Sequence, residues 1–190
     1  MSLLDIHVLG SPILRHETTP VTVVTDEMRR LIDDMFETMY AARGIGLAAP
    51  QVGRQERLTV IDITRDPDSR QPMVFINPEI VAREGTIRGE EGCLSIPEVF
   101  GEVQRSARVV VRALDRDGQH FEAEATELLA RCLQHEIDHL HGRLFIDHLS
   151  LLKRRSALAK WDDERGKYPD FRRMVVPAVL IAEHHDDAEL

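Results

Sequence analysis

Two histidines four residues apart, His135 and His139, form the sequence H-E-x-x-H with Glu136 directly after the first. On an α-helix, residues i and i+4 lie one above the other on one face, so both imidazoles can bind a single metal ion. A glutamate at this position lies beside the ion, where its carboxylate can hold a water molecule and transfer protons. A four-coordinate catalytic metal also requires a third protein ligand and an open position. The motif therefore predicts a hydrolytic metal site whose third ligand comes from elsewhere in the chain.

Several positions compete for the role of third ligand. The slot in which metzincin proteases place a third histidine holds Phe145, although the Gly142 of that motif is present. Glu164 has a spacing that would allow it to bind, but it lies in a polar stretch typical of a solvated turn. Cys93, in E-G-C-L-S-I-P, is the better candidate. A thiolate with two imidazoles favours Zn(II), Fe(II), Co(II) or Ni(II) over Mg(II) or Ca(II).

A third stretch, residues 44–53, reads G-I-G-L-A-A-P-Q-V-G. Its small residues allow the backbone to approach a ligand closely. It contains Gln51, whose side-chain N–H can donate a hydrogen bond to a developing oxyanion. The stretch therefore favours a substrate-binding loop.

The segments G-I-G-L-A-A-P-Q, E-G-C-L-S and Q-H-E-I-D-H together resemble the peptide deformylase family, in the family's order and with compatible spacing. The resemblance covers residues from about 5 to about 155. It implies a metal-dependent hydrolase that removes the formyl group from the initiator methionine of nascent proteins and releases formate. N-formylmethionyl nascent peptides are then the expected partners.

The resemblance also implies a role for individual residues. Cys93, His135 and His139 would be the metal ligands, and Glu136 would take a proton from water and deliver it to the leaving amine. The side-chain amide of Gln51 and the backbone N–H of Leu94 would bind the formyl oxygen as an oxyanion hole. The remaining residues expected at the substrate site are Gly46, as a backbone contact to the peptide, Ile45, Leu128 and Cys132, around the methionine side chain, and Glu91, which supports the site through hydrogen bonds.

The spacing of the ligands does not choose the metal. Zinc is the ordinary choice for such a site, whereas the resemblance favours Fe(II) in the cell, with nickel or cobalt as substitutes.

Two other functions remain open at this point. A zinc endopeptidase of the HExxH type would use Glu164 as its third ligand and leave Gln51 and Gly46 without a role. A non-catalytic, deformylase-like peptide-binding protein would not need Glu136, which is present.

Composition restricts the class of protein. The chain has 190 residues, 43% of them hydrophobic and 30% charged, as expected of one globular domain. A formal net charge of −9 argues against DNA as a partner, and no apolar run is long enough to predict a membrane span. Two cysteines do not form a disulfide framework, and one of them is the candidate thiolate ligand. Both points fit a reducing compartment, so we expect a cytoplasmic protein.

The pattern predicts an α+β fold, in which short antiparallel or mixed β-sheets pack around a central helix that carries H-E-x-x-H. An apolar stripe of helical spacing predicts an N-terminal helix over 25–42, and the motif helix is expected over 126–141. A C-terminal amphipathic helix is expected over 149–161. Strands are expected at 57–63, 73–76, 79–83, 107–114 and 119–125.

The chain is expected to divide at residue 165. Residues 1–165 would form the catalytic domain, and residues 166–190 a C-terminal extension with an apolar stretch and then an acidic tail. The basic face of the helix over 149–160 is expected either to make transient contact with the ribosome, as the resemblance implies, or to be a solvated surface.

Overall fold

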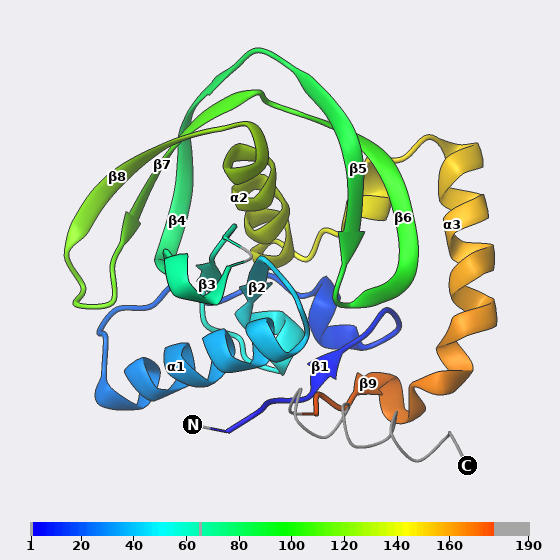
Figure 1. Ribbon diagram of the computed structural model, residues 1–190, viewed down its shortest axis with the longest axis horizontal. Helices are drawn as coiled ribbons and strands as arrows, with labels where there is room; N and C mark the ends of the chain where they lie inside the picture. Colours follow the sequence, from blue (N-terminus) through cyan, green and yellow to red (C-terminus); the bar gives the residue numbers. More distant parts are fainter. Residues whose placement is uncertain (1, 65, 177–190) are drawn as a thin grey trace.

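The computed structural model describes residues 2–64 and 66–176, and within them the fold is α+β, as predicted (Figure 1). Three antiparallel sheets and three α-helices are formed by the described residues. The largest sheet has the strand order β2-β3-β4-β7-β8. Its strands are Gly46–Ala48 (β2), Leu58–Ile61 (β3), Met73–Glu84 (β4), Arg108–Leu114 (β7) and His120–Thr126 (β8).

Strand β7 shows why this sheet forms where the sequence predicts it. Val109, Val111 and Ala113 are buried, whereas Arg112 between them is exposed, which is the period of two that a strand with one covered face requires. Strand β4 differs from the prediction of two short strands. It is continuous through Asn77-Pro78, where its pairing with β7 shifts register. Proline lacks a backbone N–H, so the ladder is interrupted there while the chain stays in the sheet.

A second sheet is a hairpin that the sequence pattern did not indicate. It consists of Ile87–Cys93 (β5) and Ile96–Arg105 (β6), paired from Ile87↔Arg105 to Cys93↔Ile96. Cys93 therefore lies at the closed end of the hairpin. The buried face of β6 packs with Leu144, Phe145 and Trp161, and this hydrophobic cluster holds the hairpin in place.

Helix α1 (Asp26–Ala41) matches its prediction to within a residue at each end. The side chain of Thr25 accepts a hydrogen bond from the N–H of Met28 at 3.3 Å, which caps the first turn. The left-handed residue that follows the helix is Arg43, with φ 58°. At the next residue, Gly44, a Cβ would lie 2.7 Å from the side chain of Leu94.

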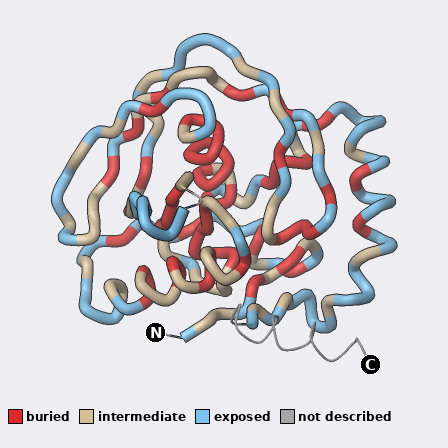
Figure 2. Tube along the Cα trace, in the orientation of Figure 1, coloured by how far each residue is buried: buried red, intermediate tan, exposed pale blue. Residues whose placement is uncertain are grey.

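Helix α2 (Glu127–Leu140) contains the H-E-x-x-H motif, and ten of its fourteen residues are buried. In Figure 1 it lies between the large sheet and the β5–β6 hairpin, and the tube coloured by burial is mostly red along it (Figure 2). Thr126 is at the N-cap position, but its side chain makes no capping hydrogen bond. The helix ends before Gly142, whose φ is 67°.

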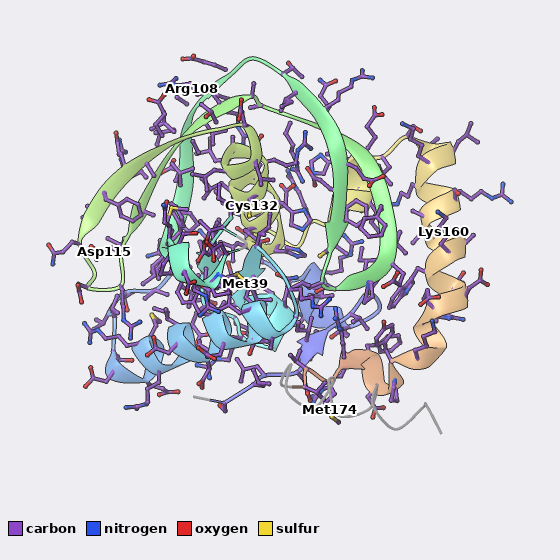
Figure 3. All side chains as sticks on the ribbon, in the orientation of Figure 1. Met39, Arg108, Asp115, Cys132, Lys160 and Met174 are labelled. Carbon is purple, nitrogen blue, oxygen red and sulfur yellow. The ribbon has the colours of Figure 1, made fainter. Side chains whose placement is uncertain are left out.

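Helix α3 (Leu151–Glu164) begins after Ser150 and is buried only at Ala157 and Trp161. The chain then returns to the N-terminal region, where Arg172–Arg173 (β9) pairs with Ile6–His7 (β1). Met174 lies just beyond β9 at the margin of the molecule (Figure 3). The predicted acidic tail, and the apolar stretch from residue 177 onward, lie outside the described residues. Within the described ranges, no helix is both long and apolar enough to cross a bilayer.

Candidate metal centre and cleft

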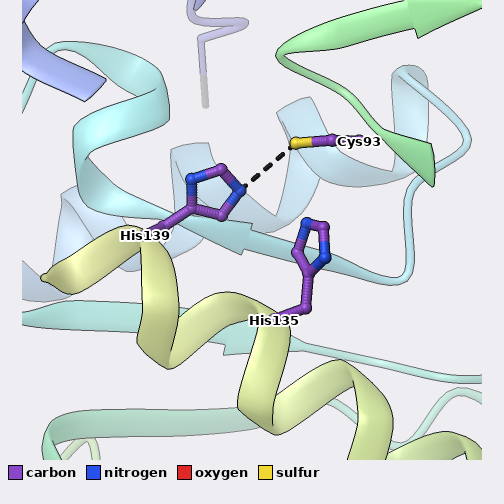
Figure 4. Close-up of side chains that lie close together, drawn as sticks. All are labelled: Cys93, His135 and His139. Carbon is purple, nitrogen blue, oxygen red and sulfur yellow. Dashed lines mark hydrogen bonds between the residues drawn. The ribbon is translucent and has the colours of Figure 1, made fainter. Parts of the chain in front are cut away.

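Helix α2 and the hairpin bring Cys93, His135 and His139 together (Figure 4). The two imidazoles come from successive turns of the helix, with ring centroids 5.0 Å apart. Cys93 Sγ lies 3.2 Å from Nε2 of His139, and the ligand-type atoms of all three residues lie within 4.8 Å of one another. One sulfur and two nitrogens at this spacing fit a divalent transition metal and leave a coordination position open.

The surroundings shift the pKa values of the two cysteines in opposite directions. Burial alone would raise the pKa of Cys93, but the positive charge of His139 and hydrogen bonds from both histidines lower it to about 5. Burial raises the pKa of Cys132 well above its ordinary value, and the charges of Glu136 and Glu91 raise it further. Cys93 is therefore available as a thiolate, which is the form that binds metals, while Cys132 remains a thiol.

Behind His135 lies a buried carboxylate, that of Glu91. Its Oε2 is 3.0 Å from Nδ1 of His135, so the other ring nitrogen, Nε2, is the one free to bind a metal. Arg105 donates two hydrogen bonds of 2.9 Å to this carboxylate, and Arg131 donates another of 2.8 Å. Burial would raise the pKa of Glu91, but the hydrogen bonds and positive charges of His135 and Arg105 outweigh it and hold the pKa well below its ordinary value.

Arg105 and Arg131 are the residues that the sequence interpretation missed. Buried arginines look like surface charges in a sequence, although Arg131 precedes His135 by four residues and so shares its helix face. Arg105 also binds Asp138, which in turn lies 2.7 Å from Nε2 of His148. The network continues from the metal centre to the molecular surface.

Glu136 lies on the cleft side of the cluster. Its Oε2 is buried and has no hydrogen-bond partner among the described residues. Burial raises its pKa, the charges of His135 and His139 lower it, and the pKa comes to about 7. Gly46 leaves no space beside it, since a Cβ at Gly46 would lie 2.5 Å from Oε1 of Glu136 and 2.9 Å from Sγ of Cys132. A carboxylate poised in this way can both accept and release a proton near neutral pH.

Gln51 is held in one orientation by the 3-10 helix Ala49–Val52. Its Oε1 accepts a hydrogen bond of 2.8 Å from the N–H of Ala48. The amide nitrogen then points at the hairpin, 3.1 Å from Oγ of Ser95 and 3.6 Å from Sγ of Cys93. A fixed N–H donor thus faces Cys93, where it could donate to a developing oxyanion.

A cleft of about 530 Å³ opens over these residues. Its lining includes every sequence-predicted site residue except His139, which is almost fully buried. The cleft residues predicted for substrate binding are Ile45, Gly46, Glu91, Leu128 and Cys132, and Leu94, predicted for the oxyanion hole, lines the cleft as well. Of these, Leu128 is 45% exposed and lies at the rim.

Glu164, the alternative third ligand, is not part of the cluster. It lies at the end of α3, and its carboxylate pairs with Lys167 at 2.8 Å. Among the described residues, the only group of three or more metal-ligand side chains within reach of one ion is Cys93, His135 and His139. The geometry therefore removes the structural basis for the Glu164 site.

Comparison with known proteins gives a consistent result. The family model for polypeptide deformylase matches residues 3–155. A peptide deformylase of Alkalilimnicola ehrlichii is 56% identical over 155 residues, which is 82% of this chain and 86% of that protein. The crystal structure of a peptide deformylase from Legionella pneumophila has a TM-score of 0.82 at 48% identity, covering 86% of this chain and 96% of that one. A peptide deformylase of Synechococcus elongatus in complex with actinonin has a TM-score of 0.80 at 45% identity, covering 83% and 86%.

Proposed function

The chain belongs to the peptide deformylase family, and on that premise we propose which of its residues carry out the reaction. The enzyme is a metal-dependent hydrolase that removes the N-formyl group from the initiator methionine of nascent proteins and releases formate. The observation that carries the assignment of residues is that the ligand atoms of Cys93, His135 and His139 lie within 4.8 Å of one another, with Cys93 and His135 lining the cleft.

Cys93, His135 and His139 hold one divalent metal ion per chain. When bound, such an ion polarises the formyl carbonyl and makes a water molecule more acidic. Fe(II) is the proposed metal in the cell, and Zn(II), Ni(II) and Co(II) are substitutes that the same donors accept. Support comes from the donor set, since a thiolate and two imidazoles suit these metals better than Mg(II) or Ca(II). Glu91 orients His135 for this task.

Glu136 is the general base and then the general acid. Its Oε2, which has no hydrogen-bond partner in the described part of the chain, accepts a proton from the attacking water and later delivers it to the departing N-terminal amine. A pKa of about 7 suits both roles, because the ideal acid–base catalyst titrates near the working pH.

Gln51 and Leu94 bind the oxygen of the formyl group. The amide nitrogen of Gln51, fixed by Ala48, and the backbone N–H of Leu94 stabilise the negative charge that develops there. Gly46 contacts the substrate backbone, and Ile45, Leu128 and Cys132 surround the methionine side chain. Formyl is the smallest acyl group, so a site this crowded around Glu136 excludes acetyl.

Three further assignments belong to the proposal. Helix α2 is the central element around which the sheets pack, a role that its burial supports. Residues 1–165 are the catalytic domain and residues 166–190 an extension. The helix over 149–160, with Lys153, Arg155 and Lys160 exposed, makes transient contact with the ribosome in the cytoplasm.

The experiment that tests the function is an assay of metal-reconstituted protein. Chain purified without oxygen and loaded separately with Fe(II), Ni(II) or Zn(II) is assayed for formate release from formyl-Met-Ala-Ser and for cleavage of casein. Formate release without casein cleavage supports the proposal. Casein cleavage without formate release contradicts it and favours an endopeptidase.

A further inference from the structure

Residues 168–173 lie beyond the match to the family model, which ends at residue 155. Two of them, Tyr168 and Arg173, nevertheless line the cleft. The C-terminal segment of this chain therefore supplies part of the wall along which a substrate would lie.

The backbone of Arg173 is fixed by its pairing with the N-terminal strand. Arg173 is the register partner of Ile6, which is fully buried. Next to this pair, the carbonyl oxygen of Phe171 accepts a hydrogen bond of 2.9 Å from the N–H of Val8. The N–H of Leu9 in turn donates to the carbonyl oxygen of Ser95 at 2.8 Å. The segment is thus tied, through β1, to the turn that follows Cys93.

Side-chain packing fixes the rest of the segment. Tyr168 stacks on Trp161 with ring centroids 5.7 Å apart and an interplanar angle of 12°. Phe171 covers Gly10, where no Cβ would fit. Asp170 and Phe171 both have φ 54°, a left-handed conformation that residues other than glycine keep only where the surroundings impose it. A segment held in this way presents its side chains in one arrangement.

The charge of Arg173 is not used within the described part of the protein. Arg131, another arginine of the cleft wall, binds Glu91 at 2.8 Å. Arg173 takes part in no ion pair and no side-chain hydrogen bond among residues 2–64 and 66–176, and it is half-buried. A guanidinium presents five N–H donors in a planar fork, which suits carbonyl and carboxylate oxygens.

Arg173 enters the cleft from the side of β1, whereas Leu128 and Cys132 border it from helix α2. A volume of about 530 Å³ falls within the range of about 300–1,000 Å³ that is usual for small-ligand sites, so the cleft has room for more than a formyl group. When the formyl group of a peptide reaches Glu136 and its methionine lies against Cys132, the residues that follow can contact other parts of the cleft wall, which include Arg173.

We propose that Arg173 is a specificity-determining residue that binds an oxygen acceptor of the substrate peptide beyond its formylmethionyl residue, either a main-chain carbonyl or a carboxylate. The inference rests on the proposed function of the cleft. It assigns to the C-terminal segment a direct role in peptide binding, while the reaction itself is carried out by residues on α2, on the hairpin and at Gln51.

The test compares Arg173→Gln with Arg172→Gln in the full-length, metal-loaded chain. Arg172 is the matched control, because it is the adjacent β9 residue, it is exposed, and it does not line the cleft. The substrates are formyl-Met amide, formyl-Met-Ala-Asp amide and formyl-Met-Ala-Asn amide. Removing one charge-assisted contact predicts a loss of about tenfold in kcat/KM for the tripeptides, equivalent to about 1.4 kcal/mol, expressed mainly in KM.

For Arg173→Gln, the activity on formyl-Met amide and the thermal unfolding midpoint should both match the wild type. A larger loss for the Asp peptide than for the Asn peptide would identify a carboxylate as the acceptor, and equal losses would identify the carbonyl. Equal losses on the short and long substrates, or an equal effect of Arg172→Gln, would overturn the inference. If the wild type hydrolyses none of the three substrates, the proposed function fails instead.

Discussion

Nδ1 of His135 lies 3.0 Å from Oε2 of Glu91, so a buried acid behind the metal centre sets the position of one proposed ligand. Glu91 is itself fixed by Arg105 and Arg131, both buried. The metal affinity of the site should therefore depend on residues that never touch the metal.

Glu91→Gln tests this dependence. The glutamine keeps an acceptor for the arginines but loses the charge that polarises His135, so we expect the affinity for Co(II) to fall by about 10- to 100-fold. Competition with a chromophoric chelator measures it. The surface pair formed by Glu17 and His141, at 3.1 Å, supplies the control, and Glu17→Gln should leave the affinity unchanged. Equal affinities for wild type and Glu91→Gln would refute the orienting role.

The two cysteines should differ in reactivity. With a pKa of about 5, the Cys93 thiol of metal-free protein is ionised at pH 6.5, whereas Cys132 is protonated. Thiolates are the species that iodoacetamide alkylates. Peptide mass spectrometry should find the label on Cys93 alone, and prior loading with Zn(II) should prevent it. Labelling of Cys132 first, or labelling that Zn(II) does not reduce, would contradict the assignment of Cys93 as a ligand.

Gly46 should tolerate no side chain. The Cβ of Gly46→Ala would lie 2.5 Å from Oε1 of Glu136, which must then move. Displacing a catalytic group by about 1 Å costs on the order of 100-fold in rate, and we expect a fall of that size in kcat/KM. Gly166→Ala is the control, because nothing lies within 4 Å of a Cβ there. Full activity of Gly46→Ala would show that Glu136 does not need its present position.

Asp62 should make stability depend on pH. It is fully buried, and burial would raise its pKa, but hydrogen bonds from Thr64, Tyr40 and Gln71 lower it below the ordinary value. A carboxyl whose pKa is lower in the folded state stabilises the fold above its unfolded pKa of about 3.9, and that contribution is lost as pH falls through the folded value.

Asp62→Asn should therefore lower the free energy of unfolding at pH 7 by about 1–3 kcal/mol. The difference from wild type should shrink as the pH is lowered below 4. Urea unfolding at several pH values measures both effects. Asp68→Asn, on the exposed loop nearby, should change neither. A difference that grew on acidification would show that the pKa of Asp62 is raised instead.

The elements that could be predicted are those whose signal lies within one short stretch of the sequence. Helix α1 followed from apolar residues at helical spacing. The hairpin around Cys93 did not follow, since β5 reads I-R-G-E-E-G-C and lacks an apolar alternation. The pairing of β1 with β9 was also beyond reach, because each strand has two residues and more than 160 residues separate Ile6 from Arg173.

The candidate site was more accessible to sequence reasoning than the fold. The i, i+4 spacing of His135 and His139 already implies one helix face. The short distance between this pair and Cys93 could be established only from the structure. What the sequence could not indicate is the set of residues behind the site. The partners of Arg105 are Glu91 and Asp138, 14 and 33 residues away, and no local pattern couples such positions.

The most direct test of the account measures formate release from formyl-Met-Ala-Ser by metal-loaded wild type and by Glu136→Ala, with the metal content of both determined. Proton transfer by a positioned side chain contributes about 10²- to 10⁴-fold to rate. We therefore expect rapid release by the wild type and a loss of that size in Glu136→Ala, which should still bind its metal. A metal-loaded wild type that releases no formate, or a Glu136→Ala variant that releases it as fast, would contradict the account.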